Sequence, residues 1–380
     1  MNMNALKLFF KNYVYPVATL SGSVIGVGFL ALPYIALKVG ITAMLFYFVV
    51  LVGIILCINL LFGEISLKTP DFKRFPGFVG FYLGKWAKRV TLCSEIAGSS
   101  GVLLVYVIIG GQFLADILVP LFGGSALWYS LIFLVAASIC IYFGTTLISH
   151  FEFGALVLLA VILVIIFIKG FGHIAFSNIL LHDSQTAMNW KTLFLPYGAI
   201  IFSLWGTGLI PETEEMLKKN KKSLKKIIVA STLIPAAFYL IFIFLILGIS
   251  GAQTTESSLG GLAHFLGQGV IAVAVCIGVI TTFTAFLTQG LLLKKICMYD
   301  MNMKPVLAWL FTCVPPLVLF LLGFNSFVYL ISFIGGVLLS VDGILILLMY
   351  QKIGGKRMII YPLAVVFLAA ILYEIVFFIT

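Results

Sequence analysis

Apolar residues occur along this chain in long runs, separated by short polar stretches. A helix needs about 20 mainly apolar residues to cross the roughly 30 Å hydrocarbon core of a bilayer. The third and eighth runs are longer than this, which predicts helices that tilt or project into the cytoplasm. We therefore expect an all-α polytopic membrane protein with eleven transmembrane helices, near residues 14–37, 40–67, 92–120, 126–147, 151–170, 192–217, 224–249, 259–296, 304–322, 325–350 and 358–379.

Composition supports this interpretation. Hydrophobic residues make up 62% of the chain and charged residues 9%, against about 25% charged residues in a soluble domain. The first run lacks the small-residue cleavage site of a signal peptide, so we expect it to remain as a membrane helix. The six cysteines form no CxxC pair, which argues against a disulfide framework or a zinc site.

The basic residues orient the predicted bundle. With a cytoplasmic amino terminus, 20 of the 23 lysines and arginines fall on the inner side, and only Lys38, Lys169 and Lys191 lie outside. This inside-positive bias predicts an external carboxyl terminus. It also explains the net charge of +10 without a nucleic-acid partner. The run "KKNKKSLKK" is interpreted as a topology determinant, with binding of anionic lipid as the alternative. Short termini and the absence of a glycosylation sequon favour a prokaryotic inner membrane.

Two predicted helices contain breaking residues at matching places. The first carries "SGSVIGVGFLALPY", with three glycines and a proline, and the sixth carries "FLPYGAIIFSLWGTGLIPETEEM", with Pro196 and Pro211 near its ends and Gly206 and Gly208 between them. Taken alone, "GSVIG" is equally consistent with a GxxxG packing face. The recurrence five helices later predicts two groups of five, and the odd number requires the second group to be inverted. The expected units are 1–174, an inverted 175–353, and one further helix in 354–380.

Paired interrupted helices in inverted halves indicate the binding site of a secondary transporter. Unwound backbone at membrane depth is tolerated only where it lines a cavity or binds a ligand. Glycine permits the unusual dihedral angles and lets a ligand approach closely. Freed carbonyls can bind a cation or an ammonium group, and N–H groups at a half-helix start can hold a carboxylate. Such a site suits a zwitterion.

The motifs "GSVIGVGFLALPY", "VYVIIGGQFLADIL" and "IFSLWGTGLIPETEEM" resemble the amino acid/auxin permease family of the amino acid–polyamine–organocation superfamily, which includes bacterial hydroxy- and aromatic-amino-acid permeases. The resemblance covers nearly the whole chain and implies the leucine-transporter-like fold. It places the substrate between the broken helices, beside Ser23, Gly26, Val27, Gly28, Tyr106, Phe202, Ser203, Leu204, Trp205 and Thr207.

Within that set, the N–H groups from Gly26 to Gly28 would hold the carboxylate, and carbonyls near Ser23 and Phe202–Leu204 would hold the amine. Tyr106 matches a tyrosine that the family often places beside the substrate. Trp205 departs from the smaller residue of many relatives, and could either shrink the pocket or stack on an aromatic substrate. For these aromatic side chains, ordinary packing within the bundle is the alternative.

The resemblance also implies a sodium site between helices one and eight, and the motif "GVITTFTAF" carries its small-x-x-hydroxyl-hydroxyl spacing. The implied ligands are neutral oxygens, which suit Na⁺. They belong to Gly22, Ile25, Gly278, Thr281 and Thr282. The threonines could instead only bond back to the preceding turn.

A proton is the rival coupling ion, because a carboxyl group inside a membrane is costly and suggests a function. Asp342 is the best candidate, with a structural hydrogen bond as the alternative. Asp116 and Glu374 lie near outer helix ends and are expected to reach water. Glu212, Glu214 and Glu215 border the lysine run and are expected to form ion pairs at an inner gate.

No HExxH, Walker-type or GxSxG motif is present, so we expect no enzymatic activity and no cofactor other than the coupling ion. A channel would call for charged rings or a filter loop. The sequence thus predicts a sodium-coupled symporter of a neutral or aromatic L-amino acid that functions as a monomer, with proton coupling through Asp342 as the alternative.

Overall fold

The computed structural model describes residues 10–71, 73–144, 148–179, 190–217, 220–299 and 301–379. Within these ranges all regular structure is helical, and each of the eleven predicted runs contains a helix. Seven helices are long and apolar enough to cross a membrane, and one bent pair forms an eighth candidate. The all-α polytopic class is confirmed, while the count of eleven spans stays a prediction. Lys7, Lys218 and Lys219, three of the predicted inner residues, lie outside the described residues.

The short helices include α5 (Phe75–Leu83), α10 (Trp190–Leu193) and α14 (Ala263–Leu266). Those that fall on the predicted runs are α2 (Tyr15–Val24) with α3 (Leu32–Val39), α4 (Ile41–Lys68), α6 (Lys85–Phe122), α7 (Ala126–Phe143), α8 (Ile148–Gly170), α11 (Leu195–Leu204) with α12 (Ile210–Leu217), α13 (Leu224–Ser250), α15 (Gln268–Tyr299), α16 (Pro305–Leu321), α17 (Phe327–Phe333) with α18 (Leu339–Lys352), and α19 (Arg357–Ile379).

One predicted limit was wrong. The eighth run was expected to be helical from residue 259, but α15 begins at Gln268. The cause is Gly267, whose φ of 80° ends the short helix α14 in a backbone conformation that other residues rarely adopt. The residues before it form a separate segment between α13 and α15.

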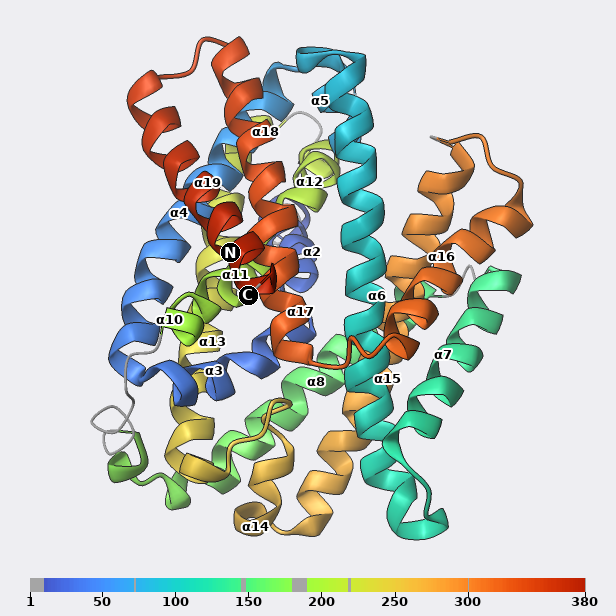
Figure 1. Cartoon of the computed structure of the whole chain (residues 1–380). Helices are drawn as coiled ribbons and strands as arrows, with labels where there is room; N and C mark the ends of the chain where they lie inside the picture. The colour runs from blue at the N-terminus through green and yellow to red at the C-terminus, as the bar shows by residue number, and fades with distance from the viewer. Residues whose placement is uncertain are drawn as a thin grey trace.

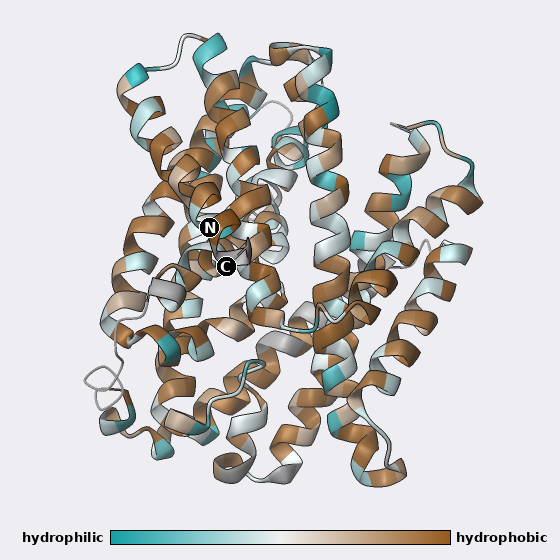
Figure 2. Cartoon of the chain, viewed as in Figure 1, coloured by the Kyte–Doolittle hydropathy of each residue, from teal (hydrophilic) through white to brown (hydrophobic). Residues whose placement is uncertain are grey.

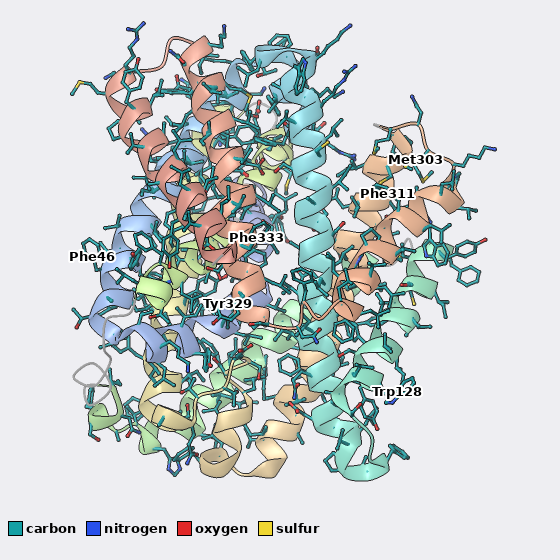
Figure 3. All side chains as sticks on the ribbon, viewed as in Figure 1. Phe46, Trp128, Met303, Phe311, Tyr329 and Phe333 are labelled. Carbon is teal, nitrogen blue, oxygen red and sulfur yellow. The ribbon has the colours of Figure 1, made fainter. Side chains whose placement is uncertain are left out.

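The bundle has two packed bodies with α6 between them (Figure 1). The larger apolar core joins α2, α4, α11, α13 and α18, and the smaller one joins α7, α15 and α16 to α6. Polar residues gather at the helix ends (Figure 2). Large apolar side chains cover the periphery (Figure 3), among them Phe46 and Trp128, which are 67% and 63% exposed. A surface of this kind suits lipid rather than water.

Both predicted helix breaks are present and have the same design. Helix α2 ends at Val24, Ile25 turns away with ψ 82°, and after Gly26 a 3₁₀ turn leads into α3. The two halves meet at 51°. Helix α11 likewise ends at Leu204, Trp205 has ψ 111°, and a 3₁₀ turn follows Gly206. The discontinuous first and sixth helices are therefore confirmed.

A third irregularity was not predicted. Residues Ile334–Leu338, between α17 and α18, form a π-helical turn. There the backbone of Gly335 touches that of Gly198 in α11, and a Cβ atom on Gly335 would overlap the Gly198 carbonyl oxygen. The glycines let the first half of the sixth helix lie directly on the tenth.

Candidate functional site

A cavity of about 810 Å³, counting its open mouth, lies against the break in the first helix. Four helical segments surround it: α2 with the following 3₁₀ turn, α6, α8 and α15. The residues that line it include Gly22, Ser23, Ile25, Gly26, Val27, Tyr106, Gly278 and Thr281.

The break presents main-chain groups to this cavity. The N–H of Ile25 still reaches the Ser21 carbonyl at 3.0 Å, and the N–H of Gly26 donates to the Val24 carbonyl at 2.9 Å. Beyond Gly26 the regular α-helical ladder stops and the 3₁₀ turn begins. A Cβ atom on Gly26 would lie 3.9 Å from the Tyr106 hydroxyl oxygen, so α6 places this hydroxyl opposite the break. The glycine leaves that space open to a ligand.

The structure brings part of the predicted substrate set together. Ser23, Gly26, Val27 and Tyr106 line the cavity. The predicted residues of the sixth helix, Phe202, Ser203, Leu204, Trp205 and Thr207, are not among its lining residues.

These residues lie beyond the 3₁₀ turn of the first helix. A Cβ atom on Gly28 would come within 2.7 Å of Phe202 Cδ1 and Ser203 Oγ, which shows how tightly α11 packs on that turn. The Ser203 hydroxyl donates back to the Ala199 carbonyl at 2.7 Å. Leu204 is fully buried and Thr207 is 4% exposed. The described geometry therefore gives the sixth helix contact with the break, and its contact with substrate stays a prediction.

Four of the five predicted sodium ligands line the same cavity: Gly22, Ile25, Gly278 and Thr281. Thr282 is fully buried beside them. The hydroxyls of Thr281 and Thr282 donate to the Gly278 carbonyl at 3.0 and 2.7 Å, which is the back-bonding named above as the alternative. A hydroxyl that donates its proton keeps lone pairs for a cation, so back-bonding and ligation are compatible.

Asp342 lies apart from the cavity, in the first turn of α18 directly after the π-helical turn. Its Oδ1 atom is buried and has no hydrogen-bond partner within the part of the chain that is described. A buried carboxylate oxygen without a donor is costly. The position remains compatible with a protonatable group.

The cavity also has an apolar part of its lining, which was missed by sequence reasoning. It consists of Phe29, Phe113, Leu259, Ala274 and three residues of α8, namely Ile162, Leu163 and Ile166. Phe113 packs on Gly278, where a Cβ atom would come within 2.7 Å of the ring. No sequence signal separates these residues from lipid-facing ones, because both are apolar and both lie in long hydrophobic runs.

The loop between α13 and α15 closes one side of this cavity. Ser258 has a φ of 62°, and its hydroxyl donates to the Leu30 carbonyl in the 3₁₀ turn of the first helix. The next residue, Leu259, lines the cavity. In the same loop, burial raises the pKa of the Glu256 carboxyl, while the ammonium group of Lys38 and backbone N–H groups at the start of α17 oppose the rise.

Next to the lysine run, Glu214 of α12 forms an ion pair with Lys221 at 2.7 Å and accepts a hydrogen bond from Ser66 near the end of α4. The predicted ion pair next to the lysine run is confirmed for this glutamate. Its role as a gate stays a prediction.

Comparisons with known proteins agree with this architecture. The crystal structure of MhsT in complex with L-phenylalanine aligns with a TM-score of 0.61, over 96% of this chain and 97% of that chain, at 14% identity. The likeness confirms the leucine-transporter-like fold. No curated protein sequence matches the chain. The model of the tryptophan/tyrosine permease family matches residues 11–357, so the chain belongs to that family. It is therefore a multi-pass membrane permease rather than an enzyme.

Proposed function

We propose that this member of the tryptophan/tyrosine permease family is a secondary active transporter that carries a neutral or aromatic L-amino acid by alternating access. The observation that carries the proposal is the cavity at the helix break, whose lining combines the main chain of the break with apolar side chains. The main chain of the break suits the amino and carboxylate groups of the substrate. The apolar side chains suit a large apolar or aromatic side chain.

We also propose a family assignment and a division into repeats from the sequence motifs. The three quoted motifs favour the amino acid/auxin permease family, and with it the repeat units 1–174 and 175–353 followed by an additional helix in 354–380. The matching design of the two helix breaks supports this division. We further propose a cytoplasmic amino terminus, an external carboxyl terminus, a prokaryotic inner membrane and a functional monomer, on the grounds of the basic residues and the single pseudo-symmetric chain.

Sodium is the coupling ion that we propose, bound by oxygens of Gly22, Ile25, Gly278, Thr281 and Thr282. All five belong to the two segments that face each other across the cavity. Occupancy would order the break in the first helix and so raise the affinity for substrate, and by linkage the substrate would raise the affinity for sodium to the same degree.

Proton coupling through Asp342 is the second candidate, favoured by the buried Oδ1 atom of that side chain, which has no hydrogen-bond partner among the described residues.

Uptake into proteoliposomes that contain the purified protein distinguishes the two candidates. Uptake of a labelled mixture of L-amino acids is measured at fixed pH with and without an inward sodium gradient, and then with an inward proton gradient alone. Sodium stimulation supports the threonine site, and stimulation by protons alone supports Asp342. A channel, the remote alternative, would show neither saturation nor counterflow. Absence of uptake by folded protein would refute the amino acid assignment.

A further inference from the structure

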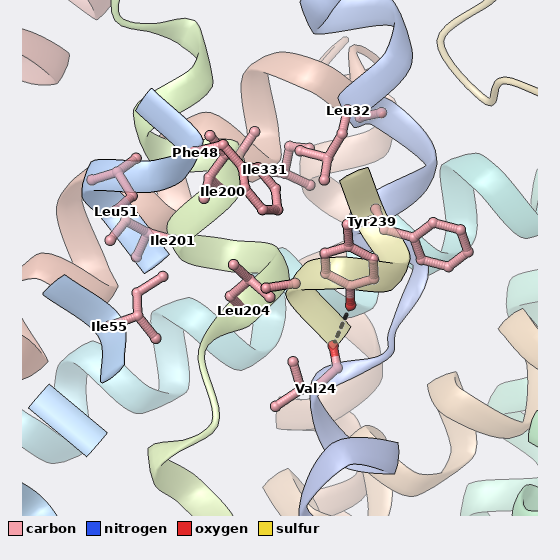
Figure 4. Packing of buried hydrophobic residues seen from close by; sticks show 14 of the residues in the cluster. Val24, Leu32, Phe48, Leu51, Ile55, Ile200, Ile201, Leu204, Tyr239 and Ile331 are labelled. Carbon is pink, nitrogen blue, oxygen red and sulfur yellow. Dashed lines mark hydrogen bonds between the residues drawn. The ribbon is translucent and has the colours of Figure 1, made fainter. Parts of the chain in front are cut away.

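Helix α13 places one polar side chain between the two interrupted helices. Tyr239 is fully buried, and its hydroxyl lies 3.0 Å from the Val24 carbonyl oxygen and 3.1 Å from the Ser203 carbonyl oxygen. Figure 4 shows the bond to Val24 beside the packed residues of α11. Val24 is the last residue of α2, and Ser203 is the penultimate residue of α11. A single hydroxyl therefore meets the carbonyl ends of both half-helices.

Carbonyl groups in the last turn of a helix lack an intrahelical donor and carry the negative end of the helix dipole. The fold points two such ends at the same buried spot. Without a donor between them, the two carbonyl groups would repel each other away from water, which is costly, although the Val24 carbonyl also accepts a hydrogen bond from the Gly26 N–H. The Tyr239 hydroxyl supplies the donor. It has a single proton, so the two carbonyl groups share it.

The ring of Tyr239 is held independently of its hydroxyl. It stacks on Phe29 with a centroid distance of 5.3 Å and an interplanar angle of 9°. Phe29 lines the cavity from the 3₁₀ turn of the first helix. Tyr239 thus supports the cavity wall from behind with its ring, and spans the two breaks with its oxygen.

We propose that Tyr239 is a positioning residue that couples the two helix breaks, so that neither unwound segment changes its conformation without the other. The expected effect on uptake rests on the proposed transport function. The coupling of the two breaks does not. Because the hydroxyl touches only main-chain carbonyls, the effect does not depend on the side chains of the first and sixth helices.

The test compares Tyr239→Phe with Tyr197→Phe in the full-length purified chain. Tyr197 is a matched control: it is also buried, and its hydroxyl lies 3.2 Å from the Ser340 hydroxyl, between α11 and α18. Phenylalanine keeps the ring in both variants, so Tyr239→Phe retains the stack on Phe29. Thermal unfolding identifies any variant that fails to fold.

The first readout is amide hydrogen exchange of the peptides covering residues 20–30 and 200–210. In Tyr239→Phe we expect exchange to rise about tenfold in both segments together, with neither rising in Tyr197→Phe. A rise in only one segment, a rise in neither, or an equal rise in the control overturns the proposal. None of these results depends on what the protein transports.

The second readout is amino acid uptake into proteoliposomes. We expect a higher KM in Tyr239→Phe with little loss of maximal rate, because the break that holds the substrate loses its support. An unchanged KM in an actively transporting Tyr239→Phe variant refutes the link to transport. Failure of the wild-type protein to take up any amino acid refutes the proposed function instead, and leaves the exchange result to decide the role of Tyr239.

Discussion

Replacement of Thr282 by valine distinguishes a cation ligand from a structural threonine. The side chain is fully buried, and its hydroxyl donates to the Gly278 and Val279 carbonyls at 2.7 and 3.0 Å. Valine keeps the shape and removes only the donor and its lone pairs. The Gly278 carbonyl retains the Thr281 hydroxyl at 3.0 Å, so it is not left without a side-chain donor. The expected cost in folding free energy is therefore small, about 0.5–1.5 kcal/mol.

The expected effect on sodium is larger. Interactions with a charged group contribute about 1.5–3 kcal/mol each. Loss of one oxygen among five ligands should therefore raise the half-saturating sodium concentration by about 10- to 100-fold. The assay is sodium activation of amino acid uptake in proteoliposomes, together with stabilisation of the purified protein by sodium in thermal unfolding. Both should shift in Thr282→Val.

Thr312→Val is the matched control. Thr312 is also fully buried and its hydroxyl donates back to the Ala308 carbonyl at 2.8 Å, but it belongs to α16 and does not line the cavity. Thr312→Val should lower the free energy of unfolding by a similarly small amount and keep the sodium dependence of the wild type. An unaltered half-saturating sodium concentration in an active Thr282→Val protein would show that the threonine only bonds back to its own helix.

Three further predictions follow from packing and charge. Gly335→Ala should reduce the free energy of unfolding by about 1–3 kcal/mol or abolish folding, because its Cβ atom would overlap the Gly198 carbonyl oxygen. Thermal unfolding measures this effect, and an unchanged midpoint contradicts the close contact. Glu374→Gln should keep the free energy of unfolding within about 1 kcal/mol of the wild type, because glutamine retains the hydrogen bond to the Ser332 hydroxyl. Glu374→Ala loses this bond and should unfold at a lower temperature. Equal unfolding midpoints of the two variants would show that the bond does not stabilise the fold. A second pocket is lined by Ser66, Thr69, Glu214 and Lys221. Lys221→Ala should leave Glu214 without its ion-pair partner and raise the labelling rate of a cysteine introduced at Thr69 in this pocket, and equal labelling rates would argue against a gate there.

The helix breaks could be predicted because their causes are local. Glycine and proline act on the backbone of their own residue, so the interruption near Gly26 and that near Gly206 are visible in the sequence. The ion pair of Glu214 was also foreseen, since acidic and basic residues adjoin each other there. Both are confirmed by the structure because they depend on near neighbours along the chain.

Features that depend on distant neighbours were not predicted. Glu374 was expected to reach water, but it is only 2% exposed and accepts a hydrogen bond from Ser332 at 3.1 Å. Its position near a helix end says nothing of what packs over it, and here α19 lies on the π-helical turn. In the same way, the α8 residue Ile166 is chemically identical to lipid-facing isoleucines, and only tertiary packing turns it towards the cavity.

The asymmetry of the cavity follows from the same tertiary contacts. On one side of the first-helix break, α11 packs against the 3₁₀ turn so closely that a Cβ atom on Gly28 would overlap Phe202 and Ser203, and Tyr239 fixes the two half-helix ends together. On the other side, α6, α8 and α15 leave the main chain of the break open. A ligand held by that main chain has its free space on the α8 side, where the wall is apolar. Among the described residues, the break in the sixth helix meets the first through its packing on Gly28 and through the carbonyl contact of Tyr239, and it contributes no lining residue to the cavity. We therefore expect it to affect binding by supporting the first break.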